Sequence, residues 1–143
     1  LGMDVPLFQS HGFGNIKYAR EAGEAGEGII FPCGRLLIAE TLPENHPQKA
    51  VLMKYKKDFE SKFGEDASTF GGHAYDAVLI LAEAIKKAGS DKEKVRDAIE
   101  NLKGLAGIGG VYNFSPQDHL GLDINAFDML TVKNGKFAKY EDK

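Results

Sequence analysis

The stretch from Ser68 to Gly89 constrains the fold most, because its apolar residues recur at helical spacing over a long run. After Gly72 these residues follow one another in steps of three and four, which is the period of an α-helix: Ala74, Tyr75, Val78, Leu79, Leu81, Ala82 and Ile85. The stripe is too wide for a helix that buries a single face. It predicts a central core helix preceded by a polar loop. A second interpretation places Phe70 and His73 at the mouth of a ligand cleft, and the pattern does not decide between the two.

Size and charge exclude several classes of protein. At 143 residues, with 43% hydrophobic and 27% charged residues, the chain matches one ordinary globular domain. The net charge is −3, and no cluster of Lys and Arg is interleaved with aromatic residues, which argues against a nucleic-acid partner. The densest basic run, Lys54 to Lys57, lies among acidic residues and is interpreted as a solvated helix face.

The single cysteine and the chain start bear on the compartment. Cys33 excludes an internal disulfide, and because no nucleophile motif surrounds it, we expect a buried structural thiol. No apolar run approaches the roughly 18 residues needed to span a bilayer, and no signal peptide is visible. Since the chain starts at Leu1 without an initiator Met, we expect a mature or cut-out piece.

The predicted elements follow one another in the order typical of an α/β protein. The list is a helix end at Leu1–Gly2, a strand over 5–8, a loop over 9–15, a helix over 16–25, a buried strand over 27–32, either an extended segment or a helical turn over 35–39, a helix from Pro47 to a stop at Gly64, the helix of the 68–89 stretch, a helix from a Ser90 cap to Gly104, and strand character over 111–114. Residues 126–140 predict a β-hairpin whose turn, Asn134–Gly135, suits type I′.

Common catalytic and metal motifs are absent. The glycines of 104–110 form neither G-x-G-x-x-G nor a Walker pattern, so we expect a flexible corner and not a phosphate site. The four histidines lack metal-ligand spacing, and the scattered carboxylates nominate no acid/base pair. We therefore predict neither an enzyme nor a cofactor. His11 differs from the other histidines because it follows a short strand, where ligands of open α/β sheets gather. Phe70 occupies a similar position before a helix.

Taken together, these features resemble the C-terminal part of the type I periplasmic solute-binding proteins of the branched-chain amino acid (Liv-type) ABC transporter family. The resemblance rests on an ordered set that spans nearly the whole chain: Leu1-Gly2 with Pro6, Glu27-Gly-Ile-Ile30, the Tyr55/Phe59 helix ending at Phe63-Gly64, His73-Ala-Tyr75-Asp76-Ala77, Ala84-Ile85 with Ala88-Gly89, Gly107 to Phe114, and the closing hairpin.

The resemblance implies an α/β fold of two lobes that closes on a small molecule and delivers it to an ABC permease outside the cytoplasm. Residues 1–32 would belong to the second lobe, 33–125 would form a helical part of the first lobe, and 126–143 would return to the second lobe as the hairpin. Family members are more than twice this length. The missing N-terminal part of the same protein is therefore an expected partner, and the exposed faces of a fragment make a homo-oligomer or strand exchange a further expectation.

The resemblance also nominates ligand contacts. In members that bind α-amino acids, the residue that matches His11 is acidic and holds the ammonium group, whereas the residue that matches Phe70 packs on the side chain. An imidazole cannot replace that carboxylate, but it can donate a hydrogen bond to an anion. We therefore predict a carboxylate or another polar small molecule, with aromatic acids among the candidates, in place of leucine or valine. The predicted contacts are His11, Gly12 and Phe70, with Phe13 and His73 as further lining.

Two other functions compete with transport. A sensory or regulatory domain on the same fold would use ligand closure to drive a partner protein. An α/β hydrolase or transferase ranks last, because the chain lacks a nucleophile motif such as G-x-S-x-G.

Overall fold

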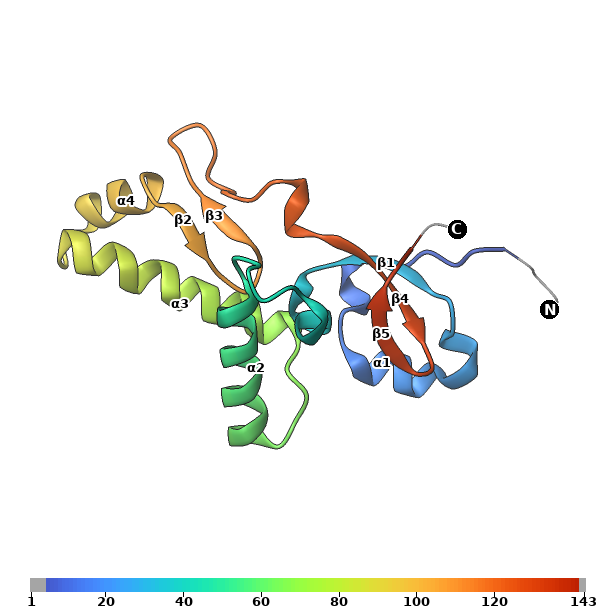
Figure 1. Ribbon diagram of the computed structural model, residues 1–143. Helices are drawn as coiled ribbons and strands as arrows, with labels where there is room; N and C mark the ends of the chain where they lie inside the picture. Colours follow the sequence, from blue (N-terminus) through green and yellow to red (C-terminus); the bar gives the residue numbers. More distant parts are fainter. Residues whose placement is uncertain (1–4, 142–143) are drawn as a thin grey trace.

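The computed structural model describes residues 5–141. Its elements in chain order are η1 (His11–Phe13), α1 (Ile16–Ala22), η2 (Gly23–Gly26), β1 (Ile30–Cys33), η3 (Arg35–Thr41), α2 (Lys49–Phe63), α3 (Thr69–Ala88), α4 (Lys92–Glu100), β2 (Lys103–Ala106), β3 (Val111–Asn113), η4 (Ile124–Ala126), β4 (Asp128–Lys133) and β5 (Lys136–Lys139). Figure 1 shows two groups, which we call the sheet half (α1, β1, β4 and β5) and the helical half (α2, α3, α4, β2 and β3). The mixture of helices and short strands confirms the predicted α/β class.

The sheet half is an antiparallel sheet in the order β1-β4-β5. Asn134 and Gly135 join β4 to β5 with φ values of 52° and 67°, so both have the positive φ that a type I′ turn requires. The predicted hairpin is confirmed. The strand predicted over 5–8 is reduced to one parallel bridge, between Phe8 and Ile30. The helix end predicted at Leu1–Gly2 lies outside the described residues.

Separate apolar clusters lie inside the two halves. In the sheet half, Phe31, Cys33 and Leu130 are completely buried. The predicted burial of the Cys33 thiol is therefore confirmed, and burial raises the pKa of this thiol to about 11. In the helical half, Leu52 and Ile108 anchor one cluster, and a further cluster lies beneath α4. Among the described residues these clusters are separate, and η3 contributes to both, with Ile38 in the first and Leu36 and Ala39 in the second.

Helix boundaries differ from the sequence prediction where side chains satisfy backbone groups. Helix α4 is capped by Asp91 and not by Ser90, because the Asp91 carboxylate accepts hydrogen bonds from the backbone N–H groups of Glu93 and Lys94, both at 3.0 Å. Helix α2 begins at Lys49 and not at Pro47. Helix α3 begins at Thr69, so Phe70 lies in its first turn and not in a preceding loop. Residues 35–41 form 3₁₀ turns, one of the two predicted alternatives.

The central core helix predicted from the 68–89 stretch is only partly buried. Helix α3 buries Thr69, Gly72, Asp76 and Ala84. Its apolar stripe is open along much of its length, with Val78 68%, Leu81 47% and Ile85 50% exposed. The prediction that the stripe lies in a core is wrong for this chain, because the three-stranded sheet lies in the other half (Figure 1) and the β2–β3 pair is too small to cover the helix.

Asp76, in the middle of α3, holds the glycine corner of residues 107–110. Its carboxylate accepts hydrogen bonds from Ile108 N and Gly109 N, both at 2.7 Å, and from the Tyr112 hydroxyl at 2.8 Å. A Cβ at Gly107 would lie 2.7 Å from Asp76 Oδ1, so the corner needs glycine for close approach. The predicted flexible corner is instead buried and bonded on several sides.

The substitution Asp76→Asn should destabilise the chain strongly. The asparagine NH₂ would face a backbone N–H that now donates to the carboxylate, and two buried donors cannot pair. We expect the free energy of unfolding to fall by about 2–3 kcal/mol, measured by urea denaturation. The control is Asp58→Asn on α2, whose carboxylate makes an exposed ion pair with Lys54 and should contribute less than about 0.5 kcal/mol. Equal losses in the two variants would contradict the role assigned to Asp76.

Candidate functional site

His11 lies at the junction of the two halves. It opens the short turn η1, two residues beyond Gln9, whose N–H donates to Ile30 O at 2.8 Å and so ties this segment to β1. Its imidazole packs against the His73 ring at 5.7 Å between centroids and edge-on to the Phe127 ring at 5.5 Å. His73 is on α3, and Phe127 precedes β4. Residues distant in the sequence therefore meet around one imidazole.

The buried edge of His11 has no polar partner within residues 5–141. Its Nε2 atom is shielded from solvent and makes no hydrogen bond with any described residue. Burial lowers the pKa of His11 from its ordinary value, and the neighbouring His73 lowers that pKa further. The imidazole is therefore neutral at pH 7. A polar group that is buried without a partner carries a desolvation cost, and such groups call for an explanation such as an absent ligand.

The other predicted contacts are distributed unevenly around this cluster. Phe70 exposes 54% of its surface in the first turn of α3, one turn before His73. Gly12 is exposed, and a Cβ there would meet only Ser10 Oγ, at 3.4 Å, so no crowding requires glycine. Of the predicted set, the structure brings His11 and His73 into ring contact, and Phe70 shares a helix with His73. Whether these residues touch a ligand stays a prediction.

Phe13 faces away from the His11 cluster. Its ring packs at 5.1 Å from Phe31 and 6.1 Å from Phe137, which places it against the core of the sheet half. The lining role predicted for Phe13 gains no support from this placement, because core packing already accounts for the ring. Phe13 stands two residues after His11 in η1, and the residues of such a tight turn point in different directions.

Phe127 is the contact that sequence reasoning missed. It stands next to the first residue of β4, whose Asp128 pairs with Cys33 of β1. That pairing brings Phe127 to His11, and no motif near Phe127 in the sequence predicts this contact. The only available signal was an aromatic residue at the start of a predicted strand, which is equally typical of a core position.

Close packing beneath the cluster fixes the loop that carries His11. Gly14 is buried, and a Cβ there would lie 2.7 Å from Cys33 Sγ and 3.1 Å from Thr69 Oγ1. The Thr69 hydroxyl donates to Gly14 O at 3.4 Å. The loop, β1 and the first turn of α3 are thus held together at one point, which supports the positions of His11 and His73.

Metal sites and membrane spans are two features to consider for residues 5–141. These residues contain no group of three or more His, Cys, Asp or Glu arranged to hold a metal ion. Within the same residues, no helix has both the length and the apolar character required to cross a membrane.

Comparisons with known proteins give consistent results. The sequence model of the periplasmic binding protein family matches residues 17–136. The leucine-, isoleucine-, valine-, threonine- and alanine-binding protein of Pseudomonas aeruginosa is 31% identical over 141 residues, which are 98% of this chain and 32% of that protein. The chain thus spans about a third of this curated relative.

Solved structures of binding proteins share the fold. An extracellular ligand-binding receptor from Rhodopseudomonas palustris HaA2 has a TM-score of 0.85 at 30% identity, over 98% of this chain and 42% of the receptor. The branched-chain amino acid transporter substrate-binding protein LivJ of Streptococcus pneumoniae, solved with isoleucine, has a TM-score of 0.73 at 26% identity, over 95% of this chain and 36% of LivJ. These relatives are named as binding proteins or receptors and not as enzymes.

The depressed pKa of His11 predicts a pH dependence of stability. The unfolded state, with the ordinary pKa near 6.5, binds the proton more tightly than the folded state, so the free energy of unfolding should fall as the pH drops below that value. His11→Gln should reduce this loss, measured by urea denaturation at about pH 7.5 and 5.5. A pH dependence identical in the wild type and His11→Gln would show that folding does not lower the pKa of His11.

Proposed function

The chain belongs to the periplasmic binding protein family, and on this premise we propose that it supplies one wall of the ligand cleft of an extracytoplasmic solute-binding subunit. The predicted family is confirmed, and the names of the matched binding proteins support the predicted absence of catalysis. The observation that carries the proposal is the His11 imidazole, whose Nε2 lacks a hydrogen-bond partner among the described residues and which contacts both halves at once.

The ligand we propose is a carboxylate or a similar hydrogen-bond acceptor, with aromatic acids among the candidates. A neutral imidazole offers no negative charge for an ammonium group, whereas its N–H can donate to a carboxylate. The largely exposed ring of Phe70 supplies an apolar surface on which an aromatic or aliphatic body could pack. The matched relatives bear the names of proteins that bind aliphatic amino acids, which also carry a carboxylate.

Transport is the role we infer for such a subunit. The LivJ relative is named for a branched-chain amino acid transporter, and this supports a permease of the ABC type as the partner that receives the ligand. The proposed location is the periplasm or another compartment outside the cytoplasm. The alternative is a sensing domain in which closure drives a partner, and the receptor names of other relatives keep it open.

The division of the described residues into two halves supports the lobe boundaries predicted from the sequence. We propose that residues 1–32 and 126–143 belong to one lobe and that residues 33–125 belong to the other, so that the ligand binds between them. The open stripe of α3 then needs a cover. We propose that this cover is a β-sheet in the additional polypeptide that matches the rest of the relatives, because the chain corresponds to only 42% of the HaA2 receptor and helix layers normally pack on sheets.

Ligand binding is tested by thermal shift on the intact protein, including any polypeptide that continues this chain, with leucine, benzoate and succinate as probes. A ligand at about 100 times its Kd stabilises the native state by about 2.7 kcal/mol. We expect benzoate or succinate to raise the Tm and His11→Glu to abolish this shift, since two carboxylates repel. His119→Glu, at an exposed position, is the control.

Stabilisation by leucine alone, retained in His11→Glu, would contradict the proposed ligand class and would remove His11 from the site. Lack of any shift with all carboxylates, amino acids included, would contradict the solute-binding role.

The cover of α3 is tested by a pair of charge substitutions at equally exposed residues, Val78→Glu and Leu120→Glu, at 68% and 70% exposure. In the intact protein, Val78→Glu should lower the stability by at least about 2 kcal/mol because it buries an unpaired carboxylate. Leu120→Glu should change it by less than about 0.5 kcal/mol.

Light scattering measures the molar mass of the chain by itself and so distinguishes a second copy from additional polypeptide as the cover of α3. A dimer that Val78→Glu dissociates would identify a second copy as the cover, in agreement with the oligomer expected from the sequence. Equal stability of the two variants in the intact protein would show that the face stays open.

A further inference from the structure

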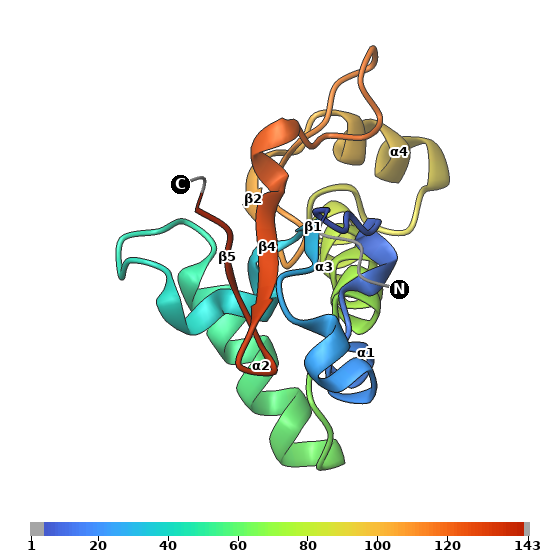
Figure 2. The same cartoon turned by 90° about the vertical axis from the view of Figure 1, so that its right-hand side faces the viewer.

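Two segments connect the halves, and they run beside each other. The first leaves β1 through Gly34 into η3, and the second leaves η4 into β4 (Figures 1 and 2). Cys33 and Asp128 are register partners, so the two segments meet where each passes between the halves. Any rotation of one half against the other must act on this pair of segments.

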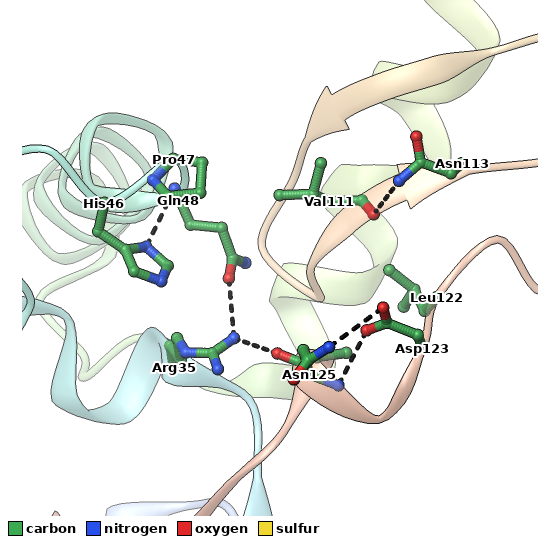
Figure 3. Close-up of a pocket in the computed structure, with 10 residues that line it drawn as sticks. Arg35, His46, Pro47, Gln48, Val111, Asn113, Leu122, Asp123 and Asn125 are labelled. Carbon is green, nitrogen blue, oxygen red and sulfur yellow. Dashed lines mark hydrogen bonds between the residues drawn. The ribbon is translucent and has the colours of Figure 1, made fainter.

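Arg35 lies in the first segment and bonds to the second segment and to the helical half. Its Nε lies 2.8 Å from Asp128 Oδ2, and the two side chains are only 15% and 16% exposed. Its Nη1 donates to Asn125 O at 2.5 Å and to Gln48 Oε1 at 3.3 Å (Figure 3). A guanidinium is a rigid fork of donors, so these bonds define an angle between their partners and not only a distance.

Gln48 extends this connection to α3. Its side chain is buried, and its Nε2 donates to Gly107 O at 2.9 Å and to Ile108 O at 3.3 Å. This is the glycine corner that Asp76 of α3 holds through the Ile108 N–H. The same helix carries His73. A continuous series of hydrogen bonds therefore runs from α3 through Gln48 to Arg35, and the ion pair of Arg35 extends it to Asp128.

The other end of the series reaches His11. Asp128 follows Phe127 directly, and the Phe127 ring contacts the His11 imidazole. The two rings that flank His11 therefore belong to opposite ends of this series of polar contacts: His73 shares α3 with Asp76, and Phe127 is next to Asp128. On its open side the Arg35 guanidinium borders a pocket of about 240 Å³, lined also by His46, Asn113, Leu122 and Asp123, so packing does not enclose it (Figure 3).

We propose that Arg35 is a positioning residue that sets the angle between the two halves and thereby the placement of His73 and Phe127 around His11. A buried ion pair is weak evidence for stability by itself, because desolvation offsets much of its attraction. The Arg35 guanidinium joins the two connecting segments to Gln48 and is therefore better suited to specifying one arrangement of the two halves. The effect on binding rests on the proposed function, whereas the effect on the angle does not.

The test measures the angle without a ligand. Spin labels on cysteines introduced at Glu24 and Lys92, one exposed site in each half, report the distance between the halves by pulsed electron resonance. The native Cys33 is buried, so it should not react with the label. We expect one narrow distance distribution in the wild type and a broader or shifted one in Arg35→Lys, since an ammonium cannot replace the fork.

Arg20→Lys is the matched control. Arg20 also forms an ion pair between the halves, with Asp66 at 2.5 Å, but both side chains are well exposed at 57% and 44%. Exposed pairs contribute little, so its distance distribution should match the wild type. Asp128→Asn, which removes the same buried pair while it preserves size, should reproduce the broadening if Arg35→Lys fails to fold.

A distribution that stays unchanged in Arg35→Lys and Asp128→Asn, with only a lower Tm, would reduce Arg35 to a stabilising residue and overturn the proposal. Equal broadening in Arg20→Lys would overturn it too, because any bond across the junction would then suffice. In the intact protein, benzoate or succinate should bind about tenfold more weakly to Arg35→Lys if the competent arrangement falls to about a tenth of the population. If the wild type binds neither benzoate nor succinate but the distance still changes in Arg35→Lys, the proposed function would be rejected and the role of Arg35 would stand.

Discussion

The buried carboxylate of Asp76 is the interaction on which the rest of the helical half depends. It is 1% exposed and has three donors around it, from the backbone of the glycine corner and from Tyr112. Burial raises the pKa of Tyr112, and the hydrogen bond to Asp76 and the charge of that carboxylate raise it further. The glycine corner that Asp76 holds in place accepts a hydrogen bond from Gln48 at Gly107 O. Gln48 in turn accepts a hydrogen bond from Arg35, at the junction.

The two halves differ in how complete their packing is. The sheet half encloses a core around Phe31 and Leu130, both completely buried. In the helical half, α3 has one face on the glycine corner and another in the open. A helix with this distribution is built to lie between two layers. The same helix brings Phe70 and His73 to the junction, so whatever covers its open face would also steady the proposed ligand contacts.

The proposed site draws its chemistry from the junction and not from either half. His11 comes from η1 and His73 from α3, and Phe127 is the residue directly before β4. Each is ordinary in isolation. Together they place two rings around the His11 imidazole, whose Nε2 has no hydrogen-bond partner among the described residues. This suits a site that gains its hydrogen bonds from a ligand as the halves come together. The polar series through Arg35 lies behind them and links their supports.

The sequence alone determined the helices, the hairpin and the family, because these depend on local patterns: the apolar period of α3, the Asn134–Gly135 turn and the ordered motifs around His73. It also singled out His11 as the histidine in an unusual place. It did not reveal that the α3 stripe is open, that Asp76 holds the glycine corner, or that Phe127 and Arg35 meet their partners. Those features follow from the pairing of β1 with β4 and from contacts over large sequence separations. Only the tertiary structure decided them, because periodicity identifies an apolar face but does not identify what packs against it.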